Sequence, residues 1–553
     1  MVNGGSRGRL LPMGDRAILV EVASLDDVLT LRRQLEASRP EGVADLVPAA
    51  RTVLVRVDPR VLPLAAARSW LDRTIASADA AAAAPADAAL VEIDAVYDGP
   101  DLDETAGLLR MSAEELVRRH SGAEWTVAFT GFAPGFGYLV SPDWPYDVPR
   151  LANPRTRVPA GSIGVAGGFS GAYPRETPGG WRLLGTTSAP LFDPDAASPA
   201  LLAPGTRVRF RPAASEVAGA SGLASSSRRS SPFPGSGPTA ESSVLRSPNE
   251  RSGKRGRPRT DEDRRPGIRI VEPGLLATLQ DLGRTGAAAL GVAPSGALDR
   301  GALRTANRLV GNDEGAAGIE VTMGGFRAAA ERDLWFAVAG AWGPIRLDGN
   351  ELDPYEAHAW PTGAELHLDW FAHGARAYLA VRGGLDGAVV LGSHASDLLA
   401  GLGPDPLRAG QRIGAGESAS AGIPAPVIAP WGAPADELLE VALAAGPRAD
   451  WFAASAHREL FEAVWTVTND ADRVGVRLDG PVLSRTRDGE LPSEGMVPGA
   501  LQVPPSGRPT ILLADGPVTG GYPVIAVATD VSLDAVAQAR PGTRVRFRHA
   551  RPI

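Results

Sequence analysis

Pro204-Gly205-Thr206-Arg207-Val208-Arg209-Phe210 recurs without change as Pro541-Gly542-Thr543-Arg544-Val545-Arg546-Phe547, 337 positions further along the chain. Proline followed by glycine favours a turn, and alternating Arg-Val-Arg before a Phe is typical of a strand with one polar and one apolar face. An identical heptapeptide near the end of each half indicates two related modules in one polypeptide. A weaker echo supports the duplication, since Val158-Pro159-Ala160-Gly161 precedes Tyr173-Pro174 as Val497-Pro498-Gly499-Ala500 precedes Tyr522-Pro523.

Length and composition exclude several classes of function. The 553 residues suffice for several domains, and a net charge of -8 argues against a generic binder of polyanions. The chain has no cysteine, which excludes a thiolate metal site, a thiol nucleophile and disulfide bonds. We find neither a signal-peptide pattern in residues 1–11 nor a long apolar run elsewhere, so we expect a cytoplasmic protein without membrane contact.

Lysine is almost absent from the chain, because Lys254 is the only one. A phosphate-binding loop that ends in Gly-Lys-Ser/Thr therefore does not occur. Outside the segment around Lys254 there is also no lysine to form a Schiff base or to carry biotin. We expect no covalent biotin on this chain, and we expect any ATP chemistry to depend on a partner or on another kind of site.

The predicted fold is mainly β with α+β, and it has four segments. We expect a small α+β domain over 12–88, a β-barrel over 89–212, a disordered linker over 213–266, and a β-rich region over 267–553. Periodicity predicts strand, helix, strand, helix between Gly14 and Ala84. Further on, it predicts helices only at Ser112–His120, about Asp299–Val310 and His457–Val464.

The predicted linker is rich in Ser, Gly, Pro and Arg and too poor in apolar residues to bury a core. Within it, Arg255-Gly256-Arg257-Pro258 matches the core of an AT-hook, a minor-groove DNA motif. A match of four residues in an Arg-rich segment is weak, so we expect a solvated tether and no nucleic-acid partner.

Two glycine-rich stretches of the first half carry candidate chemistry. Gly131-Phe132-Ala133-Pro134-Gly135-Phe136-Gly137-Tyr138-Leu139 predicts a sharply turned loop whose backbone approaches another group closely. Arg155, Arg157 and Glu176 lie in the Gly- and Pro-rich strings that follow. Arginine side chains in such a setting are good receptors for a carboxylate or phosphate, although such features taken alone are more often surface turns.

Taken together, these strings resemble the allophanate hydrolase subunit 1 (KipI-like) family. Tyr97-Asp98-Gly99-Pro100-Asp101-Leu102 and His120-Ser121 belong to the same resemblance. The second half resembles the subunit 2 (KipA-like) family, and the two families include the B and C subunits of bacterial 5-oxoprolinase. The strings of the second half are Pro273 to Arg284, Ser295 to Arg300, Ala306 to Asn312, Glu320 to Gly325 and Pro498 to Pro505.

The resemblance implies a cyclophilin-like β-barrel in each half and an enzyme component. The leading hypothesis is an ATP-hydrolysing 5-oxoprolinase that opens the cyclic amide 5-oxo-L-proline to L-glutamate, together with a LamB/YcsF-like subunit and with Mg²⁺ accompanying ATP. One alternative is the carboxyltransferase component of a biotin-dependent urea carboxylase and allophanate system. Another is a non-catalytic inhibitor of a histidine kinase, in which the loop from Phe132 to Tyr138 would be the recognition surface.

The predicted site combines groups from both halves. Histidine can carry a proton near neutral pH, and a carboxylate can act as acid or base where burial raises its pKa. Each residue also has a structural interpretation: His120 as a cap or core residue, Asp299 as a helix N-cap, and Asp281 and Glu320 as members of ion pairs. The catalytic candidates are His120, Asp281, Asp299 and Glu320, and the candidates for substrate binding are Arg155, Arg157, Glu176, Arg284, Arg300 and Asp515.

Overall fold

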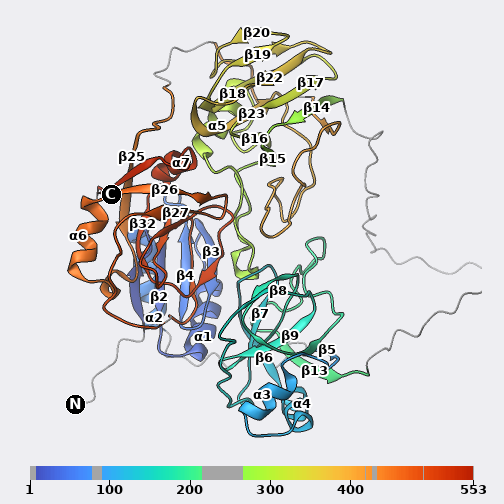
Figure 1. Ribbon diagram of the computed structural model, residues 1–553, viewed down its shortest axis with the longest axis vertical. Helices are drawn as coiled ribbons and strands as arrows, with labels where there is room; N and C mark the ends of the chain where they lie inside the picture. Colours follow the sequence, from blue (N-terminus) through green and yellow to red (C-terminus); the bar gives the residue numbers. More distant parts are fainter. Residues whose placement is uncertain are drawn as a thin grey trace, which may run out of the picture. The chain divides into compact units, whose positions relative to one another are not determined.

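The computed structural model describes residues 8–77, 90–214, 266–417, 419–425, 432–489 and 491–551. These residues form four modules, which we name the N-terminal sheet domain, the first barrel, the sandwich and the second barrel (Figure 1). Lys254, the AT-hook-like string Arg255–Pro258 and the expected helix end at Ala84 lie outside the described residues. Within the described ranges, no helix has the length and apolar character needed to cross a bilayer.

The N-terminal sheet domain has four antiparallel strands in the order β1-β2-β4-β3 and two helices. Ser24 starts the first helix, because its side chain accepts a hydrogen bond from Asp27 N while the Asp27 carboxylate bonds back to Ser24 N. The sequence predicted two of the four strands. The elements are β1 (Arg9–Pro12), β2 (Ala17–Glu21), α1 (Leu25–Ala37), β3 (Val43–Pro48), β4 (Thr52–Val57) and α2 (Leu64–Ala76).

The first barrel is a sheet of seven strands in the order β12-β9-β10-β7-β6-β13-β5. A bridge between Val96 and Thr186 links the ends of its two edge strands. The predicted helix at Ser112 is confirmed, and a short helix before it was missed. The elements are β5 (Leu90–Ala95), α3 (Leu102–Leu108), α4 (Ala113–Gly122), β6 (Trp125–Thr130), β7 (Gly137–Val140), β8 (Arg155–Val158), β9 (Ser162–Ala166), β10 (Phe169–Ala172), β11 (Thr177–Gly179), β12 (Arg182–Thr186) and β13 (Arg207–Pro212).

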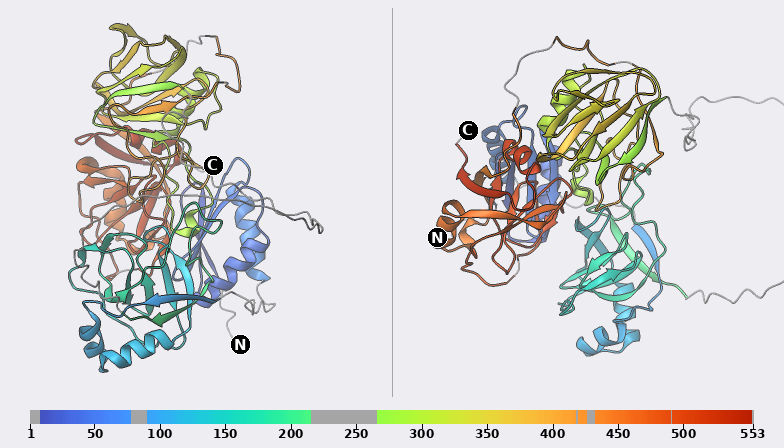
Figure 2. Two further views of the ribbon diagram at one scale, coloured as in Figure 1. Left: turned by 90° about the vertical axis from the view of Figure 1, so that its right-hand side faces the viewer. Right: turned by 45° about the horizontal axis from the view of Figure 1, so that its top comes forward.

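The sandwich packs a six-stranded sheet, β20-β19-β22-β17-β14-β24, against a five-stranded sheet, β15-β16-β23-β18-β21 (Figure 2). Helix α5 covers the outer face of the second sheet. The elements are β14 (Gly267–Pro273), β15 (Leu276–Gln280), η2 (Ala288–Leu290), α5 (Arg300–Leu309), β16 (Gly318–Thr322), β17 (Phe326–Ala330), β18 (Leu334–Trp342), β19 (Ile345–Leu347), β20 (Asn350–Leu352), β21 (His358–Trp360), β22 (Glu365–Leu368), β23 (His373–Val381) and β24 (Arg412–Gly414).

The second barrel is closed, with the strand order β25-β32-β29-β30-β27-β26-β33. Its first helix begins at Ala454, three residues before the predicted start at His457, and its second helix was missed. The elements are β25 (Leu438–Ala445), η3 (Ala449–Trp451), α6 (Ala454–Glu462), β26 (Val464–Ala471), β27 (Gly475–Asp479), β28 (Glu494–Gly495), β29 (Ala500–Gln502), β30 (Thr510–Leu512), β31 (Thr519–Gly520), β32 (Val524–Ala528), α7 (Asp530–Ala537) and β33 (Arg544–His549).

The two barrels have the same strand order, and the repeated heptapeptide has the same place in both. It forms the turn into β13 or β33, and each of these strands pairs in parallel with the first strand of its barrel. Gly205 N donates to Val127 O and Gly542 N donates to Val467 O, at 2.7 and 2.8 Å. Both glycines have positive φ, +92° and +89°, which explains why the turn keeps glycine. The predicted barrel in each half is confirmed.

The second pair of similar strings, Val158–Pro174 and Val497–Pro523, is only partly a structural repeat. Gly161 and Gly499 are equivalent, because each precedes a corresponding strand, β9 or β29, and each accepts a hydrogen bond from the chain at the end of β12 or β32. The Tyr-Pro pairs are not equivalent. Tyr173-Pro174 follows β10, whereas Tyr522-Pro523 precedes β32, the counterpart of β12. The pairing of those dipeptides is therefore wrong, since Tyr-Pro recurs at two different turns of the barrel.

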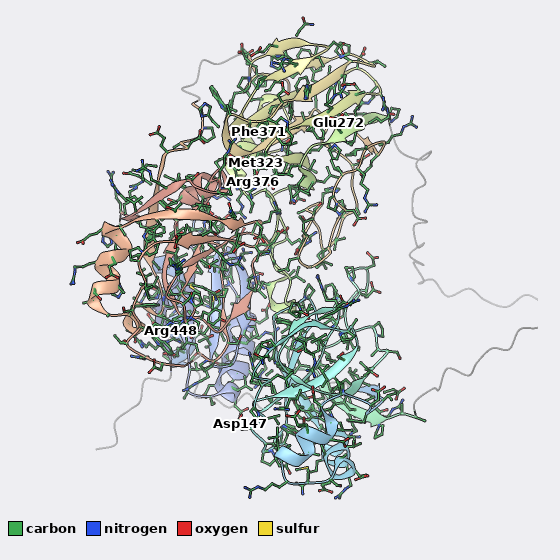
Figure 3. All side chains as sticks on the ribbon, viewed as in Figure 1. Asp147, Glu272, Met323, Phe371, Arg376 and Arg448 are labelled. Carbon is green, nitrogen blue, oxygen red and sulfur yellow. The ribbon has the colours of Figure 1, made fainter. Side chains whose placement is uncertain are left out.

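The N-terminal sheet domain packs on the second barrel, although it precedes the first in sequence. One face of its sheet is covered by α1 and α2, and the other supplies Leu11, Leu19 and Leu54 to a core shared with the second barrel. At its edge, the buried Arg448 (Figure 3) pairs with Glu494 and with Glu21 of β2. The two halves of the chain are therefore interlocked through their modules.

Candidate functional site

Strand alternation places two polar side chains on the α5 face of the sandwich. Ile319 and Val321 of β16 point into the sandwich core, so Glu320 between them points the other way. On β23, Leu379 enters the same core, whereas Tyr378 contacts the α5 side. Glu320 and Tyr378 are direct partners in the register of the two strands, and the Tyr378 hydroxyl donates to Glu320 Oε2 at 2.6 Å.

Arg473, from the loop between β26 and β27 of the second barrel, completes this buried ion cluster. Its Nε and Nη2 donate to the two oxygens of Asp515 at 2.9 and 3.0 Å, and its Nη1 donates to Glu320 Oε1 at 2.7 Å. The Ser295 hydroxyl donates to Asp515 Oδ1 at 2.6 Å. The arginine is 4% exposed and the two carboxylates 1% each, so one guanidinium partly neutralises two carboxylates away from water.

The electrostatics of this cluster follow from burial and from Arg473. Burial by itself would raise the pKa of Glu320, but the charges of Arg473 and Arg376 and the hydrogen bond from Tyr378 hold that pKa below its ordinary value. Burial and the Glu320 charge raise the pKa of Tyr378 well above its ordinary value. Glu320 is therefore a stable anion in an ion pair, as its structural interpretation expected.

Asp299 is the N-cap of α5, because its Oδ1 accepts a hydrogen bond from Ala302 N at 2.8 Å. Its Oδ2 accepts a second one from Gln538 of the second barrel at 2.7 Å. Asp534 also bonds to the start of α5, through Arg300 N and Gly301 N. Burial, and then the charge of Asp534, raise the pKa of Asp299 to about 7. Two carboxylates thus share one helix end at the joint between the sandwich and the second barrel.

Asp281 and Arg284 organise the loop Ser393–Asp397, which we call the polar loop. Asp281 accepts hydrogen bonds from Gly283 N, from the Ser393 hydroxyl and from His394 N at 2.7–2.8 Å. Arg284 is 2% exposed and donates to Val390 O and Ala395 O. Burial lowers the pKa of its guanidinium, although the neighbouring carboxylates of Asp397, Asp281 and Asp515 oppose this shift.

Several buried polar atoms around the polar loop make no hydrogen bond within the described residues. The carboxylate of Asp397 uses one oxygen to accept from Ala400 N and leaves the other unused. Burial and the charge of Asp515 raise its pKa to about 6. Unpaired buried polar atoms are costly unless a ligand or water satisfies them. The atoms are Gln280 Oε1, Arg284 Nη1, His394 Nδ1, Ser396 Oγ and Asp397 Oδ2, and we call them the open polar cluster.

The loop from Phe132 to Tyr138 of the first barrel, which we call the aromatic loop, lies next to the sandwich segment that follows Arg284. Gly135 N donates to Leu290 O at 2.9 Å, and the Thr130 hydroxyl donates to Ala289 O. Of its aromatic side chains, Phe136 is buried at 1% exposure, whereas Phe132 is 40% exposed. Phe132 has a φ of +66°, a conformation that costs energy for a bulky residue. The loop is thus mainly a packed contact between the halves.

His120 lies in the core of the first barrel and is completely buried. Its Nδ1 is bonded to the Tyr97 hydroxyl at 2.8 Å and its Nε2 to the Ser170 hydroxyl at 2.7 Å. Burial lowers the pKa of its imidazole to about 3, which keeps the ring neutral. These contacts give a proton no path to a substrate, so the catalytic role predicted for His120 finds no support in its surroundings.

The other predicted residues of the first half also make their contacts apart from the polar loop. Arg155 is paired with Asp101 at 2.6 Å, and Arg157 with Glu176 at 2.6 Å on an exposed surface. In the second half, Arg300 pairs with Asp530 at the joint between the modules. The structure therefore joins Asp281, Arg284, Glu320 and Asp515 in one neighbourhood and places the remaining candidates elsewhere, with Asp299 linked to it through Tyr378.

Sequence reasoning missed Arg473 and the polar loop. The only local signal for the loop is the density of polar residues in Gly392-Ser393-His394-Ala395-Ser396-Asp397 within an apolar region. Arg473 follows two aspartates and carries no motif at all. Among the described residues, we find no group of three or more histidine and acidic side chains that could hold a metal ion.

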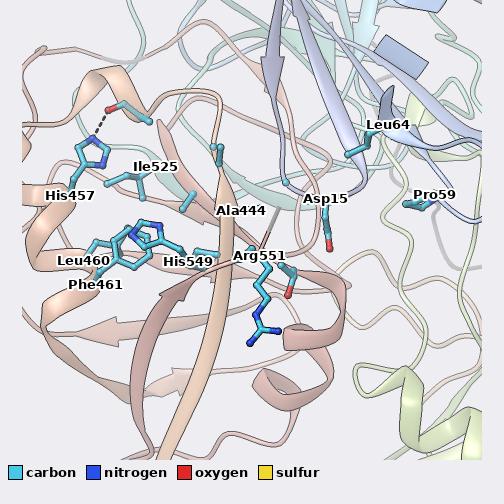
Figure 4. A pocket seen from close by; sticks show the side chains of 18 of the residues that line it. Asp15, Pro59, Leu64, Ala444, His457, Leu460, Phe461, Ile525, His549 and Arg551 are labelled. Atoms are coloured by element: carbon cyan, nitrogen blue, oxygen red, sulfur yellow. Dashed lines mark hydrogen bonds between the residues drawn. The ribbon is translucent and has the colours of Figure 1, made fainter. Parts of the chain in front are cut away.

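A cavity of about 640 Å³ lies elsewhere, between the N-terminal sheet domain and the second barrel (Figure 4). Its walls are mostly apolar, with Leu460, Phe461 and Ile525 among them. Asp15, at its edge, has a pKa raised by burial. His457 Nε2 donates to Ala449 O at 2.9 Å. None of the predicted site residues lines this cavity.

Comparison with known proteins assigns both halves. Residues 8–202 match the family "Carboxyltransferase domain, subdomain C and D", and residues 290–549 match "Carboxyltransferase domain, subdomain A and B". The C subunit of 5-oxoprolinase from Escherichia coli K12 is 36% identical over 51% of the chain and 90% of its own length. The B subunit of 5-oxoprolinase from Escherichia coli O157:H7 is 38% identical over 37% of the chain and 96% of its own length.

Two further relatives extend the comparison. The crystal structure of TTHA0988 has a TM-score of 0.79 and 35% identity, and the match covers 96% of this chain and 99% of that one. Its two-half architecture is therefore shared over nearly the whole length. The urea amidolyase of Lachancea kluyveri is 31% identical over 50% of this chain but only 16% of its own length.

Proposed function

The chain belongs to the family of carboxyltransferase-domain proteins that includes the B and C subunits of 5-oxoprolinase, and we propose that it is a fused form of these two subunits. In this proposal it opens 5-oxo-L-proline to L-glutamate at the expense of ATP, together with a LamB/YcsF-like subunit. The observation that carries the proposal is the match of successive halves of one chain to subdomains C and D and then A and B, with relatives that are separate subunits of one enzyme.

The open polar cluster is the part of the chain best suited to hold the substrate. A lactam with a carboxylate needs a cation for the carboxylate and both a donor and an acceptor for the amide. Arg284 Nη1 supplies the cation, and Ser396 and His394 offer groups for the amide. Asp397 Oδ2, with a pKa near 6, is the proposed base that takes a proton from the attacking water.

ATP would transfer its terminal phosphoryl group to the amide oxygen of the lactam and leave as ADP. The amide carbon would then react more readily with water. A phosphate-binding loop of the Gly-Lys-Ser/Thr type does not occur in the sequence, so we assign at least part of the nucleotide site to the partner subunit. The chain would contribute the substrate-binding groups and the base. Arg473 would hold Asp515 in place, and the charge of Asp515 raises the pKa of Asp397.

The test is to mix the purified chain with the LamB/YcsF-like subunit, ATP, Mg²⁺ and 5-oxoproline and to measure glutamate. Glutamate should form only in the complete mixture, and Asp397→Asn should reduce its rate at least about 100-fold, the scale of general base catalysis. Asp405→Asn is the matched control, because the Asp405 side chain is 85% exposed in the same module. A complete mixture that makes no glutamate would exclude this function.

The match to urea amidolyase supports a second candidate, transfer of a carboxyl group to urea. In that reaction a separate protein would have to carry the biotin, because biotin is attached to a lysine and the only lysine of this chain is Lys254. Carboxylation of urea with a separate biotinylated carrier, in the absence of any turnover of 5-oxoproline, would place the chain in the urea class.

A further inference from the structure

The two copies of the heptapeptide differ in what covers them. In the second half, Arg540 stands directly before the repeat and donates to Gly374 O and Phe371 O at 2.6 and 2.8 Å, so the sandwich closes this end of the second barrel (Figure 3 labels Phe371). In the first half, Ala203 occupies the position of Arg540. There, α1 of the N-terminal sheet domain faces the turn, and a cavity of about 700 Å³ remains.

This cavity, which we call the Arg32 cavity, has a cationic side and an apolar side. Arg32 and Arg33 of α1 and Arg207 of the repeat line it, and none of the described lining residues is acidic. Thr126, Thr206 and Ser198 add hydroxyl groups. Leu29, Val91 and Leu201 contribute the apolar wall. A volume of about 300–1,000 Å³ is typical of small-molecule sites, and this cavity lies within that range.

Arg32 is the residue that points to a ligand. Among the described residues, its guanidinium donates one weak hydrogen bond, from Nη1 to Pro204 O at 3.4 Å, and its buried Nε makes none. No ion pair to Arg32 occurs among the described residues, whereas Arg207 is paired with Glu124 at 2.7 Å. Burial lowers the pKa of the Arg32 guanidinium, and the charge of Glu36 on the same helix opposes this shift, but Glu36 is exposed and paired with Arg39. A partly buried guanidinium with unused donors is stabilised when an oxyanion enters.

We propose that the Arg32 cavity binds a small organic anion whose carboxylate or phosphate group contacts Arg32 and whose apolar body lies against Leu29, Val91 and Leu201. The site is separate from the polar loop, since none of its lining residues belongs to the open polar cluster. It exists because the first half lacks the arginine that closes the equivalent end of the second barrel. The proposal is therefore independent of the reaction proposed above.

Isothermal titration calorimetry on the whole chain tests this site with four probes. Hexanoate and hexyl phosphate carry both the anionic group and the apolar body, whereas hexanol and inorganic phosphate each lack one of them. We expect saturable binding of hexanoate, hexyl phosphate or both at millimolar concentration or below, and much weaker binding of hexanol and inorganic phosphate. Tighter binding of one of the two anions identifies the carboxylate or the phosphate as the preferred group.

Two variants and one control decide whether the binding occurs in this cavity. Arg32→Gln should weaken the anion about 10- to 100-fold, the loss expected for a charged hydrogen bond. Ala203→Phe keeps every charge and should abolish binding by filling the cavity. Arg68→Gln, on the exposed face of α2, should bind as the wild type does. Absence of binding by both anions, or equal binding by the wild type and both cavity variants, overturns the proposal.

Discussion

Leu460 occupies in the second barrel the position that His120 occupies in the first. In each barrel, a buried tryptophan five residues later donates its indole N–H to the carbonyl oxygen of this residue, Trp125 to His120 at 3.0 Å and Trp465 to Leu460 at 3.1 Å. Both residues are buried, with an exposed fraction of 0% for His120 and 1% for Leu460. The same structural position thus accepts either a histidine or a leucine, which identifies it as a position of the barrel core.

This equivalence predicts that His120→Leu impairs stability more than activity. The substitution leaves the hydroxyls of Tyr97 and Ser170 without their partner, at a cost of about 1–3 kcal/mol in the free energy of unfolding. Urea denaturation measures that cost. Glutamate formation by the folded variant should stay within about twofold of the wild type, because the chemistry would not use the ring. A loss of activity in a variant of normal stability would instead restore His120 as a catalytic residue.

Arg473→Met should destabilise the protein strongly. Removal of the guanidinium leaves Asp515 buried without its paired cation and Glu320 with only Arg376, at 3.7 Å, which costs about 3–5 kcal/mol. The loss should be smaller at pH 5 than at pH 7, because the pKa of Glu320 would rise once the charge of Arg473 is removed, which favours its protonation. Thermal unfolding at both pH values measures this. Arg477→Met is the control, since its side chain is 61% exposed; equal effects of the two substitutions would refute the prediction.

Asp299 should make the joint between the sandwich and the second barrel sensitive to pH. Its pKa is raised from 3.8 to about 7 in the folded chain, so the folded chain binds this proton more tightly than the unfolded chain does. The stabilisation is therefore complete below about pH 4 and is lost as the pH rises through 7.

Asp299→Asn retains an N-cap but cannot titrate. Relative to this variant, the wild type should lose about 2–4 kcal/mol of unfolding free energy between pH 4 and 8. Chemical denaturation at four or five pH values gives the difference. A difference that does not change with pH would show that Asp299 is ionised throughout.

The assignment of Asp397 as the base predicts how kcat/KM should change with pH. The pKa of Asp397 is raised to about 6 by burial and by Asp515, so kcat/KM for 5-oxoproline should rise as the pH increases through 6. Asp397→Asn should remove this inflection, and Asp405→Asn should keep it. Initial rates of glutamate formation from pH 5 to 8 provide the test. An unchanged inflection in Asp397→Asn would assign the proton transfer to another group.

Cleavage of the linker should leave the halves together. Lysyl endopeptidase cuts only at Lys254, the single lysine, and the fragments should co-elute from a sizing column because Leu11, Leu19 and Leu54 are buried against the second barrel. Leu54→Asp, which puts a charge into this core, should separate the fragments. Val61→Asp, at a residue that is 51% exposed, should not. Fragments that separate in the wild type at micromolar concentration would contradict the interlocked arrangement.

The sequence by itself determined the features that depend on short stretches of chain. The heptapeptide established the duplication, because a Pro-Gly turn followed by alternating residues forms the same strand wherever a barrel provides a partner. The N-cap Asp299 was also readable, since a cap acts within four residues. Strands β1 and β3 and the helices α3 and α7 were missed, because four to eight residues carry too little periodicity to be distinguished from a loop.

Only the tertiary structure decided which polar groups form a site. Arg473 and Glu320 are 153 residues apart, and Arg284 and Ala395 are 111 apart. No periodicity links such positions, since their contact depends on how the second barrel and the polar loop pack on the sandwich. An imidazole such as that of His120 and a guanidinium such as that of Arg155 are common in active sites. In this fold, however, both side chains are bonded to partners within the first barrel. Burial and partner choice, which set the pKa and the availability of each group, are properties of the folded chain.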